Sequence, residues 1–165
     1  MKREYYFCGC RLDEKDWYFI CFSDEEDGVY LNAENKIDAF NDLESLARYA
    51  EKRNLLITDS ELFFNNLEAL EKTLGGKKFA VDCVEFLNAW NLFGDVSVSV
   101  NGDFNSDHKI TYNIYEKLFW GNNLPAVTPE GEWYEPVWSV KELEIMRKVL
   151  LSGIALLRDN LNYTD

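Results

Sequence analysis

The amino-acid sequence predicts an α+β fold, in which an N-terminal antiparallel β-meander is followed by several packed helices in a single domain, residues 1–165. Three observations predict this class. Aromatic and β-branched runs alternate with polar turns in the first third of the chain. The apolar spacing changes to a helical period from Ile37 onward. Two later segments have the form of a helix capping box, a hydroxyl residue followed three positions later by glutamate.

The meander is expected from three extended segments. Glu4–Cys10 and Trp17–Ser23 are rich in aromatic and β-branched residues, and the polar run at 11–16 separates them. An acidic turn at 24–28 leads to a third short strand, Val29–Leu31. The acidic residues of this turn are most simply a solvated hairpin, because consecutive like charges repel one another and seek water.

Helices are expected next. One stripe at helical spacing predicts the first of them: Ile37, Phe40, Leu43, Ala47 and Ala50. A fourth short strand is expected at Asn54–Ile57. Thr58 and Glu61 have the spacing of a capping box and predict a second helix that extends to Leu74, where Gly75 and Gly76 end it.

The second half of the chain predicts three more helices. The first covers Asp82–Phe93, is ended by Gly94 and is followed by an extended piece in which valine and serine alternate. The second covers Ile110–Trp120. Ser139 then opens a capping box and a long terminal helix whose apolar stripe continues to Leu161.

Composition excludes several classes of protein. Hydrophobic residues make up 47% and aromatic residues 15% of the chain, too much apolar material for intrinsic disorder. The net charge of −13, from 30 acidic and 17 basic residues, opposes binding to a phosphate backbone, so we expect no nucleic-acid partner. The absence of a long uncharged apolar window, and of an apolar run near the start, predicts no membrane span and no secretory signal. We therefore expect a cytoplasmic protein.

Cysteine usage argues against a metal. Cys8 and Cys10 are spaced like ligands, but Cys21, Cys83 and the single His108 supply no second ligand pair at metal-binding spacing. We expect small buried thiols in a reducing compartment and no cofactor. Catalytic motifs such as G-x-S-x-G, H-E-x-x-H or a phosphate-binding glycine loop are also missing, so the chain is not expected to be an enzyme.

Two features could carry function. The first is charge segregation, since 79–108 contains five acidic residues and no Lys or Arg: Asp82, Glu85, Asp95, Asp103 and Asp107. The second is the segment Gly121–Trp138, which holds three acidic residues, no basic residue and several aromatic residues in a loop longer than compact domains normally carry. Carboxylates beside Trp and Tyr suit recognition of a basic protein.

Each feature also has a purely structural interpretation. Asp82 and Glu85 share a face of the helix N-terminus, where negative charge favours the helix dipole. At least two of Trp120, Trp133 and Trp138 are expected to pin the loop onto the core. A carboxylate pair acting as an enzyme site stays open as a third possibility.

Three segments carry a resemblance to a known family. Asp82–Phe93 (DCVEFLNAWNLF), Leu118–Pro125 (LFWGNNLP) and the turn Thr128–Gly131 (TPEG) resemble immunity proteins of bacterial toxin–immunity systems, in particular those of contact-dependent growth inhibition. The resemblance covers roughly the C-terminal half. It implies a small cytoplasmic protein that binds and neutralises the C-terminal toxin domain of a sibling cell's surface effector.

The resemblance and the charge together predict a function. Many such toxins are nucleases, which are basic because their substrate is acidic, and an RNase of the EndoU type is one class that the family implies. An acidic inhibitor places carboxylates where phosphates would lie. The alternative is a small-molecule or sugar-binding module using the aromatic residues of 120–138. The predicted toxin-binding residues are Asp82, Glu85, Asp95, Glu130, Glu132, Trp133, Tyr134 and Glu135.

Overall fold

The protein begins with a long β-hairpin. In the computed structural model, which describes residues 2–58, 61–104 and 109–164, β1 (Glu4–Leu12) pairs antiparallel with β2 (Lys15–Ser23). Only Asp13 and Glu14 form the turn, and both have positive φ, 54° and 67°. This turn matches the twist of the strands. The polar run at 11–16 is therefore not a separator, because most of it belongs to the strands.

The predicted meander is confirmed. The third strand, β3 (Gly28–Val29), pairs antiparallel with β2 and is shorter than expected, ending at Val29. Gly28 is required at this point because a Cβ there would lie 2.5 Å from the Phe22 ring and 2.6 Å from Ser99 Oγ. A larger residue would push β3 away from the helix that carries Ser99.

The segment from Ile37 corrects the first predicted helix. Ile37–Phe40 is a strand, β4, and helix α1 covers only Leu43–Lys52. The Asp42 side chain accepts a hydrogen bond from Ser45 N and so caps the helix at this point. Ile37 and Phe40 are three residues apart, a spacing that fits a helix, but in the strand they lie on opposite faces of the sheet.

The next segment corrects two further expectations. Phe63–Asn66 forms strand β5, and helix α2 covers only Leu67–Leu74, with the Asn66 side chain as its cap and Gly75 at its end. Thr58 does not cap a helix, since its hydroxyl donates to Tyr5 O at 3.1 Å. Residues 59–60 of the expected capping box lie outside the described residues. The strand expected at 54–57 is reduced to one isolated bridge, Ile57 to Tyr5.

Helix α3 starts where predicted and continues beyond its predicted end. It covers Cys83–Val100, with Asp82 as its cap. Gly94 does not end the helix. The alternating valines and serines that were expected to be extended form its last turns instead. Val96 is fully buried and continues the apolar face, which explains why the helix persists. The helix ends at Asn101, which adopts the left-handed conformation.

The last two helices are confirmed with one addition. Helix α4 covers Lys109–Gly121, and α5 covers Val140–Asn160 with the predicted capping box at Ser139. The chain then forms β6 (Leu161–Thr164), which pairs parallel with β4. Leu161 is buried as expected, but in a strand and not in the helix.

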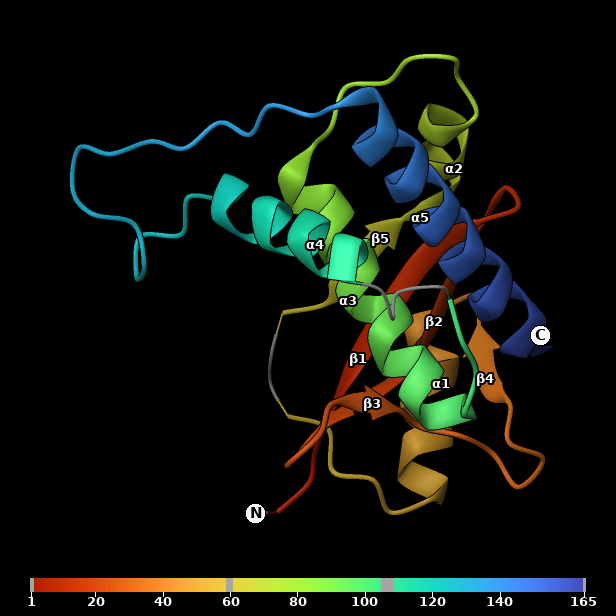
Figure 1. Cartoon of the computed structure of the whole chain (residues 1–165). Coiled ribbons are helices and arrows are strands. Elements are labelled where there is room, and N and C mark those ends of the chain that lie inside the picture. Colours follow the sequence, from red (N-terminus) through yellow and green to blue (C-terminus); the bar gives the residue numbers. More distant parts are fainter. Residues whose placement is uncertain (1, 59–60, 105–108, 165) are drawn as a thin grey trace.

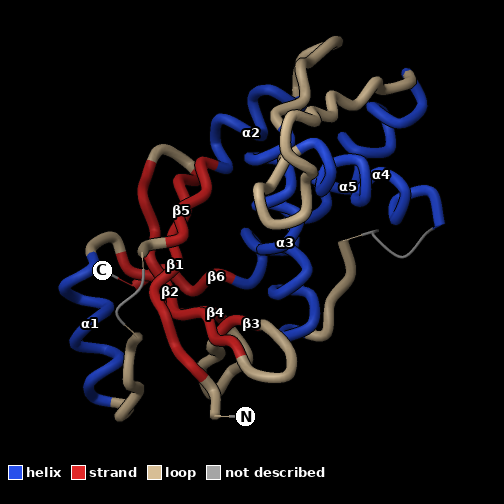
Figure 2. Tube along the Cα trace, turned by 90° about the vertical axis from the view of Figure 1, so that its left-hand side faces the viewer, coloured by secondary structure: helices blue, strands red, loops and turns tan. Residues whose placement is uncertain are grey.

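The elements form one sheet with helices on both faces. The strand order is β5-β1-β2-β4-β6, with β3 beside β2. Helices α2, α3, α4 and α5 cover one face, and α1 covers the other (Figures 1 and 2). The larger core lies under the four helices, and a smaller, tyrosine-rich core lies under α1. The α+β class is therefore confirmed. None of the described helices is both long and apolar enough to cross a membrane.

Candidate functional site

A long segment without regular structure joins α4 to α5. We call residues 122–139 the arm. Figure 1 shows it as the blue-green loop that reaches far from the helices. Glu130, Glu132 and Glu135 are all exposed on it, as the sequence predicted for a surface loop, and no basic residue lies within it. The arm therefore presents three carboxylates without internal counter-charges.

The arm has defined anchors at its base. Asn123 Oδ1 accepts a hydrogen bond from Tyr134 N at 2.7 Å, and Asn123 Nδ2 donates to Tyr134 O at 2.8 Å. Closer to α5, Lys117 Nζ donates to Val137 O, pairs with Glu142 at 3.0 Å and lies 4.5 Å from the centre of the Trp138 ring. The Asn123–Tyr134 pair ties two parts of the arm to each other, and Lys117 holds the end of the arm that precedes α5 against α4.

A turn shapes the tip of the arm. Glu132 N donates to Pro129 O at 3.0 Å, and Gly131 has a φ of 81°. The positive φ favours glycine at this position of the turn. Since Glu130 and Glu132 flank Gly131, the turn determines how their carboxylates are presented.

The tryptophans of this region behave differently from one another. Trp133 is 76% exposed and Trp120 is 47% exposed, whereas Trp138 is half-buried and packs against the core. The expectation that at least two of the three pin the loop to the core is therefore wrong. Tyr134 is 41% exposed even though its backbone is held by Asn123. Trp133 and Tyr134 are thus available to a partner.

Asp82 and Glu85 lie near the base of the arm. Asn122, the first residue of the arm, donates from Nδ2 to Cys83 O at 3.1 Å, which places the start of α3 next to the arm. Asp82 Oδ1 accepts from Val84 N and Glu85 N, both at 3.1 Å, so Asp82 caps α3 at the N-terminus where its negative charge was expected to favour the helix dipole. Both carboxylate residues are exposed.

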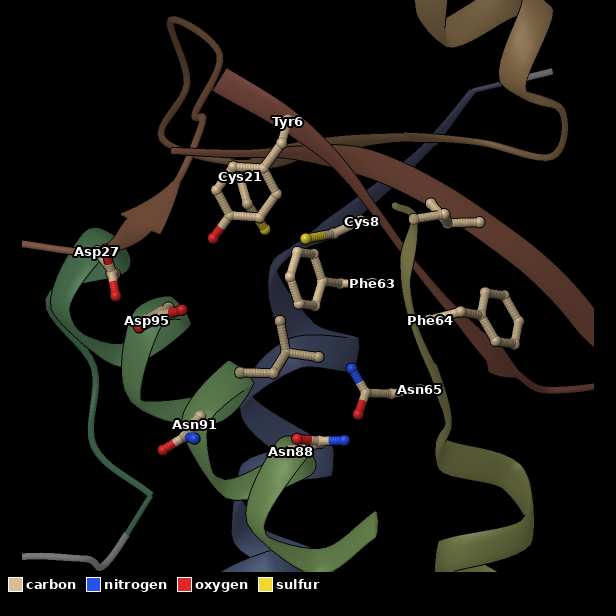
Figure 3. A pocket seen from close by; sticks show the side chains of 12 residues that line it. Tyr6, Cys8, Cys21, Asp27, Phe63, Phe64, Asn65, Asn88, Asn91 and Asp95 are labelled. Carbon is tan, nitrogen blue, oxygen red and sulfur yellow. The ribbon is translucent and has the colours of Figure 1, made fainter. Parts of the chain in front are cut away.

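Asp95 is separated from the other predicted residues. It lies 13 positions along α3 from Asp82, which corresponds to about 20 Å of helix. There it lines a pocket of about 440 Å³ formed by α3, the strands β1, β2 and β5, and the loop before β3. Figure 3 shows Asp95 beside Asp27 and the Tyr6 hydroxyl on one side of this pocket. The structure therefore divides the predicted residues into two groups: those on the arm or at the adjacent start of α3, and Asp95 in the pocket.

The environment of Asp95 disfavours its charge. Burial and, to a smaller extent, the neighbouring Asp27 carboxylate together raise the pKa of this carboxyl to about 7. No Lys or Arg is present among the described residues that line the pocket. An ionised Asp95 would therefore gain from any cation that entered.

Sequence reasoning missed most residues of the pocket. Asn88, Asn91 and Asp95 are spaced at i, i+3 and i+7 on α3, and they form a polar stripe along the middle of a helix that is mostly apolar. That stripe is a signal that a helical projection could have found. The sequence places Asp27 in an acidic turn that is most simply solvated, and its proximity to α3 depends on the packing of the sheet.

The cysteines and charged groups supply no metal centre in the described part of the chain. Cys8, Cys10 and Cys21 are buried free thiols and Cys83 is half-buried. Within the ranges that the structure describes, no group of three or more potential ligands comes together. His108 and Asp107 lie outside the described residues.

Comparison with known proteins adds information on the fold. No family model matches the chain, and no curated protein matches it. Among solved structures, the chain is similar to the C-terminal domain of SatS, whose crystal structure is described as a complex with bromine. The TM-score is 0.57 at 14% sequence identity, over 97% of this chain and 94% of the SatS chain. At this identity the likeness concerns the fold alone.

Proposed function

We propose that this protein is an immunity protein that binds a basic toxin domain of the nuclease class and neutralises it. The observation that carries the proposal is the arm, which combines three exposed carboxylates with exposed aromatic residues on a projecting and anchored loop. The resemblance of Asp82–Phe93 and Leu118–Pro125 to immunity proteins supports the same function.

Charge supports a basic partner. The net charge of −13 attracts a positively charged protein and accelerates its encounter. Glu130, Glu132 and Glu135 lie within an arm that has no basic residue, and exposed Asp82 and Glu85 lie near its base. Such an acidic surface can occupy the substrate groove of a nuclease in place of phosphates.

The aromatic residues of the arm support a protein partner over a small ligand. Trp133 is 76% exposed and Val137 is 83% exposed, so both face solvent instead of an enclosed cavity. Sugar and small-molecule sites are normally concave and bury most of the ligand surface. Exposed Trp and Tyr on an anchored loop are instead the side chains that most often dominate binding between proteins.

The test is co-expression with the product of the gene immediately upstream, the expected location of a cognate toxin. We expect that product to arrest growth of a bacterial host when expressed alone. This chain should restore growth and co-purify with the product in a stoichiometric complex. Rescue without complex formation, or no rescue, would contradict the proposal.

A matched pair of variants tests the surface. The arm variant changes Glu130, Glu132 and Glu135 to Lys. The control changes three exposed acidic residues elsewhere, Glu34, Glu51 and Asp159, to Lys, so both variants carry the same net charge. We expect the arm variant to lose rescue and the control to retain it. Equal loss in both would show that net charge, and not the arm, provides the binding.

A further inference from the structure

The pocket that contains Asp95 combines residues from distant parts of the sequence. Tyr6 and Cys8 come from β1, Phe63 from β5 and Leu92 from α3. Its volume of about 440 Å³ is within the range of known ligand pockets. Phe63 points into it and Phe64 points away (Figure 3). The pocket is therefore a built feature of the packing between α3 and the sheet.

One side of the pocket is anionic. Asp27 and Asp95 lie there together with the Tyr6 hydroxyl (Figure 3). Arg3, a basic residue next to the acidic turn that contains Asp27, forms an ion pair with Asp24 at 2.6 Å. Among the lining residues that the structure describes, the two carboxylates have no basic neighbour.

The other side of the pocket is neutral. Asn65 and Asn88 lie close together there, as Figure 3 shows, and offer amide oxygens. Leu92, Phe63 and Cys8 also line the pocket and make part of its wall apolar. A ligand that fits has a cationic head and an apolar stem, which describes the side chain of arginine or lysine.

We infer that this pocket accepts a basic side chain of the partner, with its cationic head at Asp95 and Asp27 and its stem along Leu92 and Phe63. That the side chain comes from a toxin rests on the proposed function. That the pocket binds a cationic side chain rests only on the residues that line it. Helix α3 and strand β5, which carry Leu92 and Phe63, contact each other and so hold the two side chains of the proposed stem site on packed elements.

The experiment is a titration of the isotope-labelled protein with Nα-acetyl-argininamide, followed by the backbone amide signals of Asn88, Asn91 and Asp95. The matched probe is Nα-acetyl-citrullinamide, which has the same shape and no charge. We expect saturable shifts with a millimolar dissociation constant for the arginine compound and at least about tenfold weaker binding of the citrulline compound.

Two variants locate the binding. Asp95→Asn keeps the size of the side chain and should weaken the arginine compound about tenfold, the effect of one charge-assisted hydrogen bond. Glu51→Gln removes a charge from an exposed position of α1, outside the pocket and outside the proposed binding surface, and should change the affinity less than twofold. The amide spectrum of each variant reports whether the fold is retained.

Three results would overturn the inference: equal binding of the citrulline compound, unchanged affinity in Asp95→Asn, or no saturable shift up to about 50 mM arginine compound. The titration involves neither the arm nor a toxin. A negative titration would therefore show that the pocket does not bind basic side chains, without contradicting the proposed function. Failed rescue of growth would contradict the proposed function, without affecting a positive titration.

Discussion

The side chain of Asn123 is bonded in both directions to the backbone of Tyr134, accepting from its N–H at 2.7 Å and donating to its carbonyl at 2.8 Å. One amide thus closes the intervening residues into a loop, in the manner of a paired strand. Asn123 itself has a φ of 50° and also donates to Gly121 O at 3.1 Å. The exposed ring of Tyr134 is consequently carried on a backbone that is fixed before any partner binds.

Removing this clamp should loosen the arm without unfolding the protein. Asn123→Gly deletes the side chain and tolerates the positive φ. We expect the free energy of unfolding to fall by about 1 kcal/mol and partner binding to weaken, because the arm must then be ordered on binding. Amide hydrogen exchange should accelerate at Tyr134. The control Asn35→Gly, at another positive-φ position, should leave that exchange rate unchanged.

Salt should weaken the complex through its rate of formation. The acidic surface steers a basic partner, and counter-ions screen that attraction over about 8–10 Å at physiological ionic strength. We expect the association rate to fall about tenfold or more between low and high salt, while the dissociation rate changes little. Stopped-flow mixing measures both rates. An association rate that is independent of salt would show that the charge of −13 serves only solubility.

Substitution of two tryptophans should distinguish a residue that contributes to partner binding from one that contributes to the stability of the fold. Trp133→Ala removes an exposed side chain, so the free energy of unfolding should change by less than about 0.5 kcal/mol, whereas a binding anchor should lose about 2 kcal/mol or more of affinity. Trp138→Ala removes packing beneath Lys117 and should lower the free energy of unfolding by about 1–3 kcal/mol. Thermal melts and partner titrations on both variants provide the comparison. The reverse pattern would place the anchor elsewhere.

Asp95 should make stability depend on pH. Its pKa is raised from 3.8 to about 7, chiefly by burial and then by Asp27. Between these pH values the folded state binds more protons than the unfolded state, so the free energy of unfolding falls as pH rises. Burial also raises the pKa of the neighbouring Tyr6, Cys21 and Tyr115, which keeps them neutral in this range.

Asp95→Asn should therefore stabilise the protein at pH 8 by about 1–2 kcal/mol, a figure reduced for solvent screening of a half-buried group, and have little effect near pH 4. Urea denaturation at both pH values measures the difference. Glu34→Gln is the control, since its carboxylate is exposed in a loop outside any helix. A difference for Asp95→Asn that is equal at pH 4 and pH 8 would contradict the burial of a charge.

The sequence predicts those parts of the fold that local signals determine. The two strands of the hairpin, the start of a helix near Asp82 and the Ser139 capping box are all found as expected. Strands β4, β5 and β6 were missed because each pairs with a segment far away in the chain, and their four-residue lengths are too short for a clear period. Ile37 and Phe40 also fit a helical spacing, which concealed β4.

The candidate site also has a part that local sequence predicts and a part that depends on long-range packing. The exposed carboxylates and aromatic residues of the arm follow from a long loop with prolines and no helical period, and the structure exposes Trp133 and Glu135 there. The pocket could not be predicted, because Asp27 and Asp95 meet only when α3 packs on the sheet. The burial of Asp95 and its proximity to Asp27 therefore depend on tertiary structure and not on its neighbours in sequence.

The pairing of β4 with β6 has a consequence for how the chain folds. Asn162 Nδ2 donates to Asp38 Oδ1 at 2.6 Å across a separation of 124 residues. While the ribosome is still synthesising α5, β6 does not yet exist and the edge of β4 is unpaired. The sheet that contains the β1–β2 hairpin is therefore incomplete at that stage. Contacts of such long range slow folding, and an open strand edge in a nascent chain invites pairing with other chains. Ribosome-stalled chains ending before residue 161 should therefore resist proteolysis less than chains that extend past 164.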